Sequence, residues 1–145
     1  MTAEQLEVLL REGAVERVKE DRAAARRDLD AAQAHLASLE PVSSTDPTGA
    51  FGLAYDAMRK AIVAHMRANG LRVRGSRGGH YQTGRYALAA LDDLGVAEHL
   101  LAFEDLRRLR NKSAYEAVLV EEIDVEEAVA HARAVVDAVR KALGE

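Results

Sequence analysis

The chain has 145 residues, of which 48% are hydrophobic and 30% charged, which is enough apolar material for one packed domain spanning residues 1–145. Aromatic residues make up 4% and tryptophan is absent, so aliphatic side chains on helices must build the core, and an all-α fold is expected. Cysteine is also absent, which excludes disulfides, thiolate zinc sites, iron–sulfur clusters and cysteine nucleophiles.

No apolar run approaches the roughly 18 residues that span a bilayer. Glu4 and Glu7 stand where a signal peptide would be basic and then apolar. We therefore expect a cytoplasmic protein with no membrane partner.

The net charge of -4 is unevenly distributed along the chain. Residues 72–85 carry four arginines and no acid, and residues 107–112 carry three arginines and one lysine, again without an acid. Two such windows in an acidic chain indicate a local anionic partner.

The first 40 residues are expected to form two helices. Thr2-Ala3-Glu4-Gln5 has the form of a capping box and predicts a short helix that stops near Gly13. Apolar residues at helical spacing from Val15 to Leu39 predict a long amphipathic helix that Pro41 ends, followed by a polar turn over residues 42–47.

A third helix is predicted over residues 51–66, with Asn69-Gly70 as its left-handed stop. The segment from Leu71 to Tyr81 has three glycines, three arginines and no helical period, so it reads as a basic loop.

Two further helices follow the loop in this prediction. The fourth starts near Thr83 and ends before Gly95, and its buried residues are expected to be Leu88, Leu91 and Leu94. The fifth buries Leu100, Phe103, Leu106 and Leu109.

The last part of the chain is predicted to be an apolar connection and a closing helix. Ala117 to Ile123 is apolar but aperiodic, so we expect a packed connection. Asp124-Val125-Glu126-Glu127 resembles a capping box that opens the closing helix, which runs to Leu143. The whole is a bundle of five or six helices.

The five histidines offer no metal-ligand spacing such as H-E-x-x-H, so neither a metal nor any other cofactor is expected. His35 and His131 are most simply surface residues, and His65 lies at the edge of the core. His80 differs because it lies in Gly78-Gly79-His80-Tyr81, where it approaches a phosphate or a base, or else stays in a solvated loop.

Arg110 stands on an apolar helical stripe. Phe103, Leu106 and Arg110 follow one another at i, i+3 and i+7, so a regular helix aims the arginine from its buried face. A cation there needs a partner, which is an internal acid, a subunit interface or a bound phosphate.

The segment Arg110-Asn111-Lys112-Ser113-Ala114-Tyr115 resembles the signature of HEPN domains (higher eukaryotes and prokaryotes nucleotide-binding), in which an arginine and a polar residue precede a histidine. The helix around Ala54-Tyr55-Asp56-Ala57-Met58-Arg59 and the turn Gly79-His80-Tyr81 also resemble parts of small stand-alone HEPN proteins. The resemblance covers residues 48–143 and implies an all-α homodimer with the two arginine motifs facing each other across a cleft.

Many members of that family are metal-independent ribonucleases in toxin–antitoxin or defence systems. The resemblance therefore implies a catalytic set of Arg110, Asn111 and Tyr115, with Tyr115 where the family has histidine. A phenol is a poor base at neutral pH, so His80 is the alternative base. The phosphate-binding set that we expect consists of Arg74, Arg77, His80, Arg107 and Lys112.

Tyrosine at this place also resembles HEPN proteins encoded beside minimal nucleotidyltransferases, which implies such a partner together with RNA or a nucleotide. Arg110 and Tyr115 are five residues apart, about 140° around an ideal helix, so they converge only if the helix ends or bends, or across a dimer. Three readings follow: an RNA- or nucleotide-binding protein with ribonuclease activity, a catalytically silent HEPN subunit that regulates a nucleotidyltransferase, and a plain helical dimerisation protein.

Overall fold

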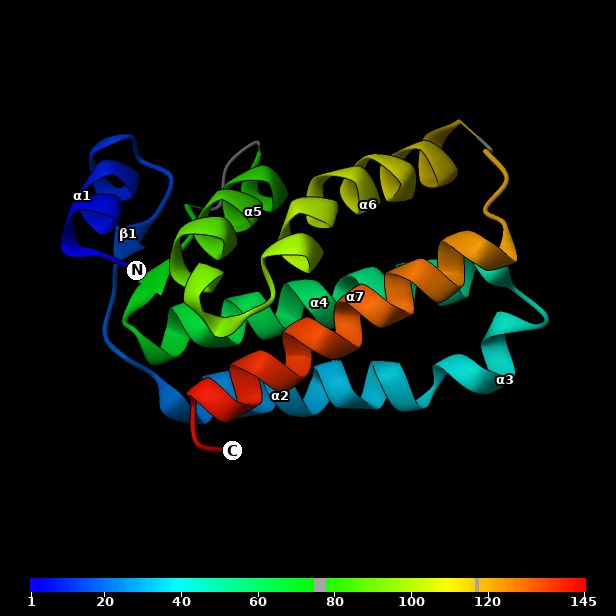
Figure 1. The fold of residues 1–145 in the computed structure, drawn as a ribbon, viewed down its shortest axis with the longest axis horizontal. Helices are drawn as coiled ribbons and strands as arrows, with labels where there is room; N and C mark the ends of the chain where they lie inside the picture. Colours follow the sequence, from blue (N-terminus) through cyan, green and yellow to red (C-terminus); the bar gives the residue numbers. More distant parts are fainter. Residues whose placement is uncertain (75–77, 117) are drawn as a thin grey trace.

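The structure is a computed structural model that describes residues 1–74, 78–116 and 118–145. The all-α prediction is confirmed: within these residues the chain forms seven α-helices, one short 3-10 helix and a two-stranded ribbon (Figure 1). The helices are α1 (Ala3–Arg11), α2 (Arg22–Ala37), α3 (Leu39–Ser43), α4 (Pro47–Ala68), α5 (Gly79–Ala90), α6 (Ala97–Tyr115) and α7 (Glu122–Ala142). The 3-10 helix is η1 (Asp92–Leu94), and the strands are β1 (Glu16–Arg17) and β2 (Leu71–Arg72). None of the helices in the described part of the chain combines the length and apolarity needed to cross a membrane.

Helix α4 is the centre of the fold. It packs against α2 on one side and α7 on another, and half of its residues are buried. Many of these are alanines, whose small side chains let neighbouring helices approach closely, while Phe51, Tyr55, Met58, Ile62 and Met66 fill the space between them. Asp46 caps the start of α4 by accepting a hydrogen bond from the Gly49 N–H. Gly70 follows the end of α4 at φ 66°, and this left-handed stop is the one that the sequence predicts.

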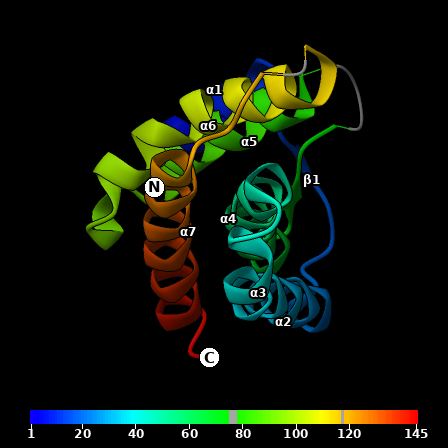
Figure 2. The ribbon, with the colours of Figure 1, turned by 90° about the vertical axis from the view of Figure 1, so that its right-hand side faces the viewer.

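Helices α5 and α6 form a second layer. Figure 2 shows them lying across the α4–α7 pair, on the side opposite α2 and α3. They approach each other at Gly84, where an added Cβ would lie 3.0 Å from the ring of Phe103. This layer carries the second basic window, residues 107–112, on α6, and the end of the first, residues 79–85, on α5.

The predicted helix from Val15 to Leu39 is wrong at its start. Glu16 and Arg17 form β1, which pairs antiparallel with β2 in the register Glu16–Arg72 and Arg17–Leu71. The helix begins only at Arg22, after Asp21 accepts a hydrogen bond from the Ala24 N–H. Tertiary pairing with a distant segment overrides the local helical period here.

The prediction that Pro41 ends this helix is also wrong. Helix α2 ends at Ala37, and Pro41 lies in the first turn of α3, where the missing N–H of proline costs no helical hydrogen bond. The turn expected over residues 42–47 therefore shrinks, because residues 42 and 43 are helical and α4 begins at Pro47.

The basic loop predicted from Leu71 to Tyr81 is shorter than expected. Its first two residues form β2, and α5 begins at Gly79, four residues before the predicted start at Thr83. Thr83 is buried and its hydroxyl donates to the Gly79 carbonyl. Residues 75–77, with Arg77, lie outside the described part of the chain.

Three details near the second half of the chain differ from prediction. Leu88 is 39% exposed on α5, while Leu91 is fully buried. The expected packed connection starts at Ala117, which lies outside the described residues, and it buries Val120 but leaves Leu119 79% exposed. The closing capping box is made by Glu121 with Asp124 at the third helical position, so α7 starts before Asp124.

Candidate functional site

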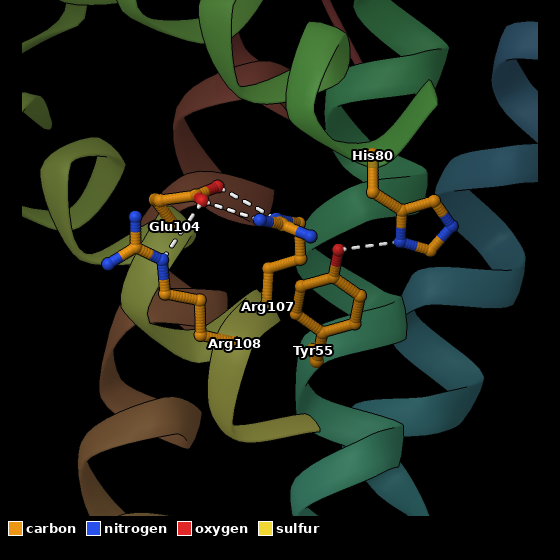
Figure 3. Close-up of polar contacts among 5 residues, drawn as sticks. All are labelled: Tyr55, His80, Glu104, Arg107 and Arg108. Atoms are coloured by element: carbon orange, nitrogen blue, oxygen red, sulfur yellow. Dashed lines mark hydrogen bonds and ion pairs between the residues drawn. The ribbon is translucent and has the colours of Figure 1, made fainter. Parts of the chain in front are cut away.

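One cluster brings together residues of α4, α5 and α6, and we call it the Tyr55 cluster. Its members are Tyr55 and Asp56 of α4, His80 of α5, and Arg107 and Arg110 of α6. Tyr55 is at its centre: its ring is buried and stacks on Phe103 with the centroids 5.2 Å apart. Figure 3 shows Arg107 and His80 on either side of the Tyr55 ring.

Tyr55 and His80 are joined by a hydrogen bond of 2.7 Å between Oη and Nδ1 (Figure 3). Burial raises the pKa of Tyr55, so the phenol keeps its proton at neutral pH. We infer that the phenol donates in this bond, because no other described residue accepts the hydrogen of its buried hydroxyl. Nδ1 of a neutral His80 is then the acceptor, and its hydrogen is on Nε2. In Figure 3 the Nε2 edge of the ring points away from Tyr55.

The pKa of His80 is lowered from the ordinary value of 6.5. Burial is the main cause, the positive charges of Arg59 and Arg110 add to it, Asp56 opposes it, and Arg107 contributes last. His80 is therefore neutral at pH 7, in the tautomer that Tyr55 fixes.

Arg110 packs its guanidinium over Tyr55, with Cζ 5.2 Å from the ring centroid, and one Nη lies 3.8 Å from a carboxylate oxygen of Asp56. The cation on the apolar stripe thus has an acid and an aromatic face from α4 as neighbours. The guanidinium makes no hydrogen bond to any described residue, and its side chain is 36% exposed. Its N–H donors remain available to a ligand.

Arg107, by contrast, is held by a carboxylate. Two of its nitrogens donate to Glu104 at 2.8 and 2.6 Å, and Arg108 donates to the same carboxylate at 3.3 Å (Figure 3). Hydrogen bonding from Arg107 lowers the pKa of Glu104, with smaller contributions from Arg108, so the carboxylate stays ionised. Glu104, three residues before the second basic window, thus offsets part of its charge, and Arg110 is left as the arginine of this window whose guanidinium has no hydrogen bond to a described residue.

Tyr115 is not part of the cluster. Helix α6 continues without interruption from Arg110 to Tyr115, so the two side chains leave it about 140° apart. Tyr115 is 86% exposed at the end of the helix. Between them, Asn111 is half-buried and Lys112 is exposed, so within one chain only Arg110 of the predicted catalytic set reaches Tyr55.

The other predicted phosphate-binding residues are divided between two places. Arg74 follows β2 and binds Glu16 at 3.2 Å, as Arg72 does from the strand itself. Arg74 and His80 both line a cavity from which Arg107 and Arg110 are absent. His80 therefore lines the cavity together with Arg74 of the first basic window and is also a member of the Tyr55 cluster with Arg107 and Arg110 of the second.

Sequence reasoning missed Asp56 and Arg59 as site residues and treated Tyr55 as core. The available signal was polar residues one and four positions after Tyr55, on a helix whose other inward positions are alanine or apolar. Residues three positions apart lie on the same face of a helix, so Asp56 and Arg59 are neighbours, with Arg59 Nε 3.9 Å from a carboxylate oxygen of Asp56.

Two further histidine pairs lie outside the cluster. Nδ1 of His65 on α4 lies 2.8 Å from the Tyr86 hydroxyl on α5. Two tyrosine–histidine pairs therefore link α4 and α5, with the tyrosine on α4 in one pair and on α5 in the other. His131, expected at the surface, is half-buried and its Nδ1 lies 2.9 Å from Nδ1 of His99. No three potential metal ligands gather in the described residues.

Comparison of the chain with protein-family models, with curated proteins and with solved structures gives no match.

Proposed function

We propose that this protein is a HEPN-like module that binds the phosphates of RNA or of a nucleotide at the Tyr55 cluster, without self-contained ribonuclease activity. The observation that carries this proposal is the placement of Arg110: its guanidinium lies over Tyr55, partly exposed, with no hydrogen bond to the described residues and only a long ion pair to Asp56. A phosphate oxygen is a strong acceptor for such an arginine, because the planar guanidinium offers it two parallel N–H donors.

The state of His80 argues against cleavage by one chain. A general base for the ribose 2′-hydroxyl needs a free nitrogen lone pair. The lone pair on Nδ1 of His80 is already used as the acceptor of the hydrogen bond from the Tyr55 hydroxyl. Nε2 carries the remaining hydrogen, so neutral His80 is a donor toward a ligand. Tyr115, at the place of the family's histidine, is on another side of α6.

We further propose that the active form is a homodimer that acts with a nucleotidyltransferase, as in a toxin–antitoxin or defence system. The apolar side chains at the corner between α6 and α7 support the dimer, because large apolar groups exposed together mark interaction surfaces. These are Tyr115, Val118, Leu119 and Ile123, with exposures of 86%, 36%, 79% and 53%.

The dimer keeps open a second candidate function, which is metal-independent RNA cleavage across the subunit interface. The exposure of Tyr115 favours it, since a side chain at the helix end is available to a partner chain. Incubating the purified protein with RNA in EDTA separates the two: the binding module leaves the RNA intact, and metal-independent fragments would establish the ribonuclease.

The binding proposal is tested with Arg110→Gln and the matched control Arg108→Gln, which removes a neighbouring, more exposed arginine that Glu104 pairs. The affinity for labelled single-stranded RNA is expected to fall about tenfold or more for Arg110→Gln, because a charge-assisted contact is lost, and less than about threefold for the control. The wild-type affinity should also fall with rising salt. Equal losses in the two variants would place the RNA site elsewhere.

A further inference from the structure

A cavity of about 470 Å³ lies between the segment that joins β1 to α2, the second half of α4, β2 with the residues that follow it, and the start of α5, where His80 lines it. We call it the β2 cavity. Its volume lies within the range of small-molecule sites. Neither Arg107 nor Arg110 lines it, so of the Tyr55 cluster, to which we assign RNA, it shares only His80.

The charged side chains that line the β2 cavity are mostly cationic: Lys19, Arg59, Arg67, Arg72 and Arg74, with Asp21 as the acid. Asp21 is occupied as the cap of α2, where it accepts from the Ala24 N–H. Arg67 pairs with Asp28 at 2.9 Å, while Arg72 and Arg74 share the single carboxylate of Glu16. Lys19 has no ion pair among the described residues. The lining therefore holds more positive charge than its neighbours neutralise.

Arg59 provides a more specific observation. Its Nε is buried and has no hydrogen-bond partner among the described residues, and the nearest acid, Asp56, is 3.9 Å away. A buried N–H donor without an acceptor loses its hydrogen bonds to water and gains none in return, which costs free energy. An anion in the cavity would supply the missing acceptor.

His80 and the start of α5 add donors to the same cavity. Because Tyr55 occupies Nδ1, the hydrogen of neutral His80 is on Nε2, the edge that faces away from Tyr55. Gly79, also in the lining, is the first residue of α5, and no described side chain caps that helix. Its first backbone N–H groups are donors at the positive end of the helix dipole.

The rest of the lining determines what kind of anion fits. Val63, Met66, Leu71 and Val73 form an aliphatic wall, and none of the described residues in the lining carries a phenyl, phenol or indole ring. Such a wall accommodates an aliphatic or sugar-like body better than a base that needs an aromatic ring for stacking.

We propose that the β2 cavity binds a small phosphate monoester with a non-aromatic body, such as a sugar phosphate, with the phosphate held by Arg59 and the Nε2–H of His80 and the body against Val63 and Val73. This inference goes beyond the proposed RNA function and does not depend on it.

The test is a titration of the 145-residue chain with ribose 5-phosphate, inorganic phosphate, ribose and AMP. Binding is measured by calorimetry and by NMR of the imidazole nitrogens of His80. Ribose 5-phosphate should bind most tightly, inorganic phosphate more weakly, and ribose not measurably. AMP should bind no tighter than ribose 5-phosphate. Bound phosphate should shift the Nε2 resonance of His80 and leave that of His65, the other tyrosine-bonded histidine of the pair, unchanged.

Two variants test the site from different directions. Arg59→Gln removes the unpartnered cation and should weaken ribose 5-phosphate about tenfold or more. Val63→Phe keeps every charge but fills part of the cavity, so it should weaken ribose 5-phosphate more than inorganic phosphate. Arg26→Gln, on α2 and paired with Glu145, is the matched control and should leave both affinities unchanged.

Three results would overturn the proposal. These are no binding of ribose 5-phosphate by the wild type at millimolar concentration, equal binding by the wild type and both folded cavity variants, and AMP binding more tightly than ribose 5-phosphate. If Arg59→Gln does not fold, the proposal is still tested by Val63→Phe and by the titration of the wild type with the four compounds. Arg110→Gln should bind ribose 5-phosphate normally while losing RNA, so failure of one site is distinguishable from failure of the other.

Discussion

The Tyr55 hydroxyl donates to Nδ1 of His80 across 2.7 Å, and this one bond determines what His80 can offer on each side. It makes the ring an acceptor toward Tyr55 and leaves Nε2, on the edge away from Tyr55, as a donor of a side chain that lines the β2 cavity. Ten residues further along α4, His65 makes the reverse arrangement with Tyr86 of α5 at 2.8 Å. The two bonds hold α4 and α5 together, but only the first is bordered by arginines.

Tyr55→Phe should therefore change the chemistry of His80 while keeping the fold. We expect a loss of roughly 0.5–1.5 kcal/mol in the free energy of unfolding, the usual contribution of one hydrogen bond. The imidazole nitrogen resonances should show His80 as the Nε2–H tautomer in the wild type and as a mixture in the variant, and RNA affinity should fall.

Tyr86→Phe is the matched control, since it removes the equivalent bond to His65. Its loss of stability should be similar, but the His80 resonances and RNA affinity should stay at their wild-type values. A wild-type His80 found with its hydrogen on Nδ1 would contradict the donor assignment.

The sequence was informative wherever a local rule determined the structure. The capping box at Thr2, the glycine stop at Gly70 and the apolar face of α4 all lie where the pattern predicts them. The failures occurred where a distant partner decides: Glu16 pairs with Arg72 across more than fifty residues, and that pairing replaces a turn of helix that the local period favours.

The candidate site shows the same division. Arg110 was identifiable because a cation on an apolar stripe needs a partner, but nothing local names Asp56 and Tyr55 as that partner. Glu104 was overlooked because the basic window was defined to start after it, although a residue three positions earlier shares a helix face with Arg107. The start of α5 was placed too late because glycines at its first turn read as loop.

The close approach of α5 to α6 at Gly84 should be sensitive to side-chain size. A Cβ there would lie 3.0 Å from the Phe103 ring, which itself stacks on Tyr55. Gly84→Val is expected to lower the free energy of unfolding by about 1–3 kcal/mol through overpacking. Gly52→Ala, on α4, adds a Cβ that would have no neighbour within 4 Å, so it should instead raise the free energy of unfolding by about 0.5–1 kcal/mol. Denaturant unfolding measures both, and equal effects at the two glycines would contradict the packing argument.

The proposed dimer should depend on the apolar corner between α6 and α7. Leu119 is 79% exposed there, so Leu119→Asp should leave the folded monomer intact, because an exposed side chain contributes little to the stability of one chain. Light scattering should give twice the monomer mass for the wild type and the monomer mass for the variant. Leu101→Asp, at a 66% exposed position of α6 away from the corner, is the control and should remain dimeric. A wild-type monomer at micromolar concentration would refute the dimer.

The stability of the protein should fall as the pH is lowered through the range in which histidine gains a proton. The pKa values of His65, His80 and His131 are all lowered from the ordinary 6.5, in each case chiefly by burial. Between its depressed folded pKa and about 6.5, each of these residues binds a proton more readily in the unfolded chain. Their contribution to stability is therefore complete above about pH 6.5 and is lost below it.

His80→Gln isolates one of these contributions, because glutamine is polar but does not titrate. Above about pH 7.5, the free energy of unfolding of the variant should differ from that of the wild type by a constant amount. Below about pH 6.5 the wild type should lose stability faster than the variant, since only the wild type must keep a buried imidazole neutral beside Arg59 and Arg110. Urea unfolding at half-unit steps from pH 8 to pH 5 measures this, and a difference that stays constant over the whole range would show that His80 titrates alike in the folded and unfolded chains.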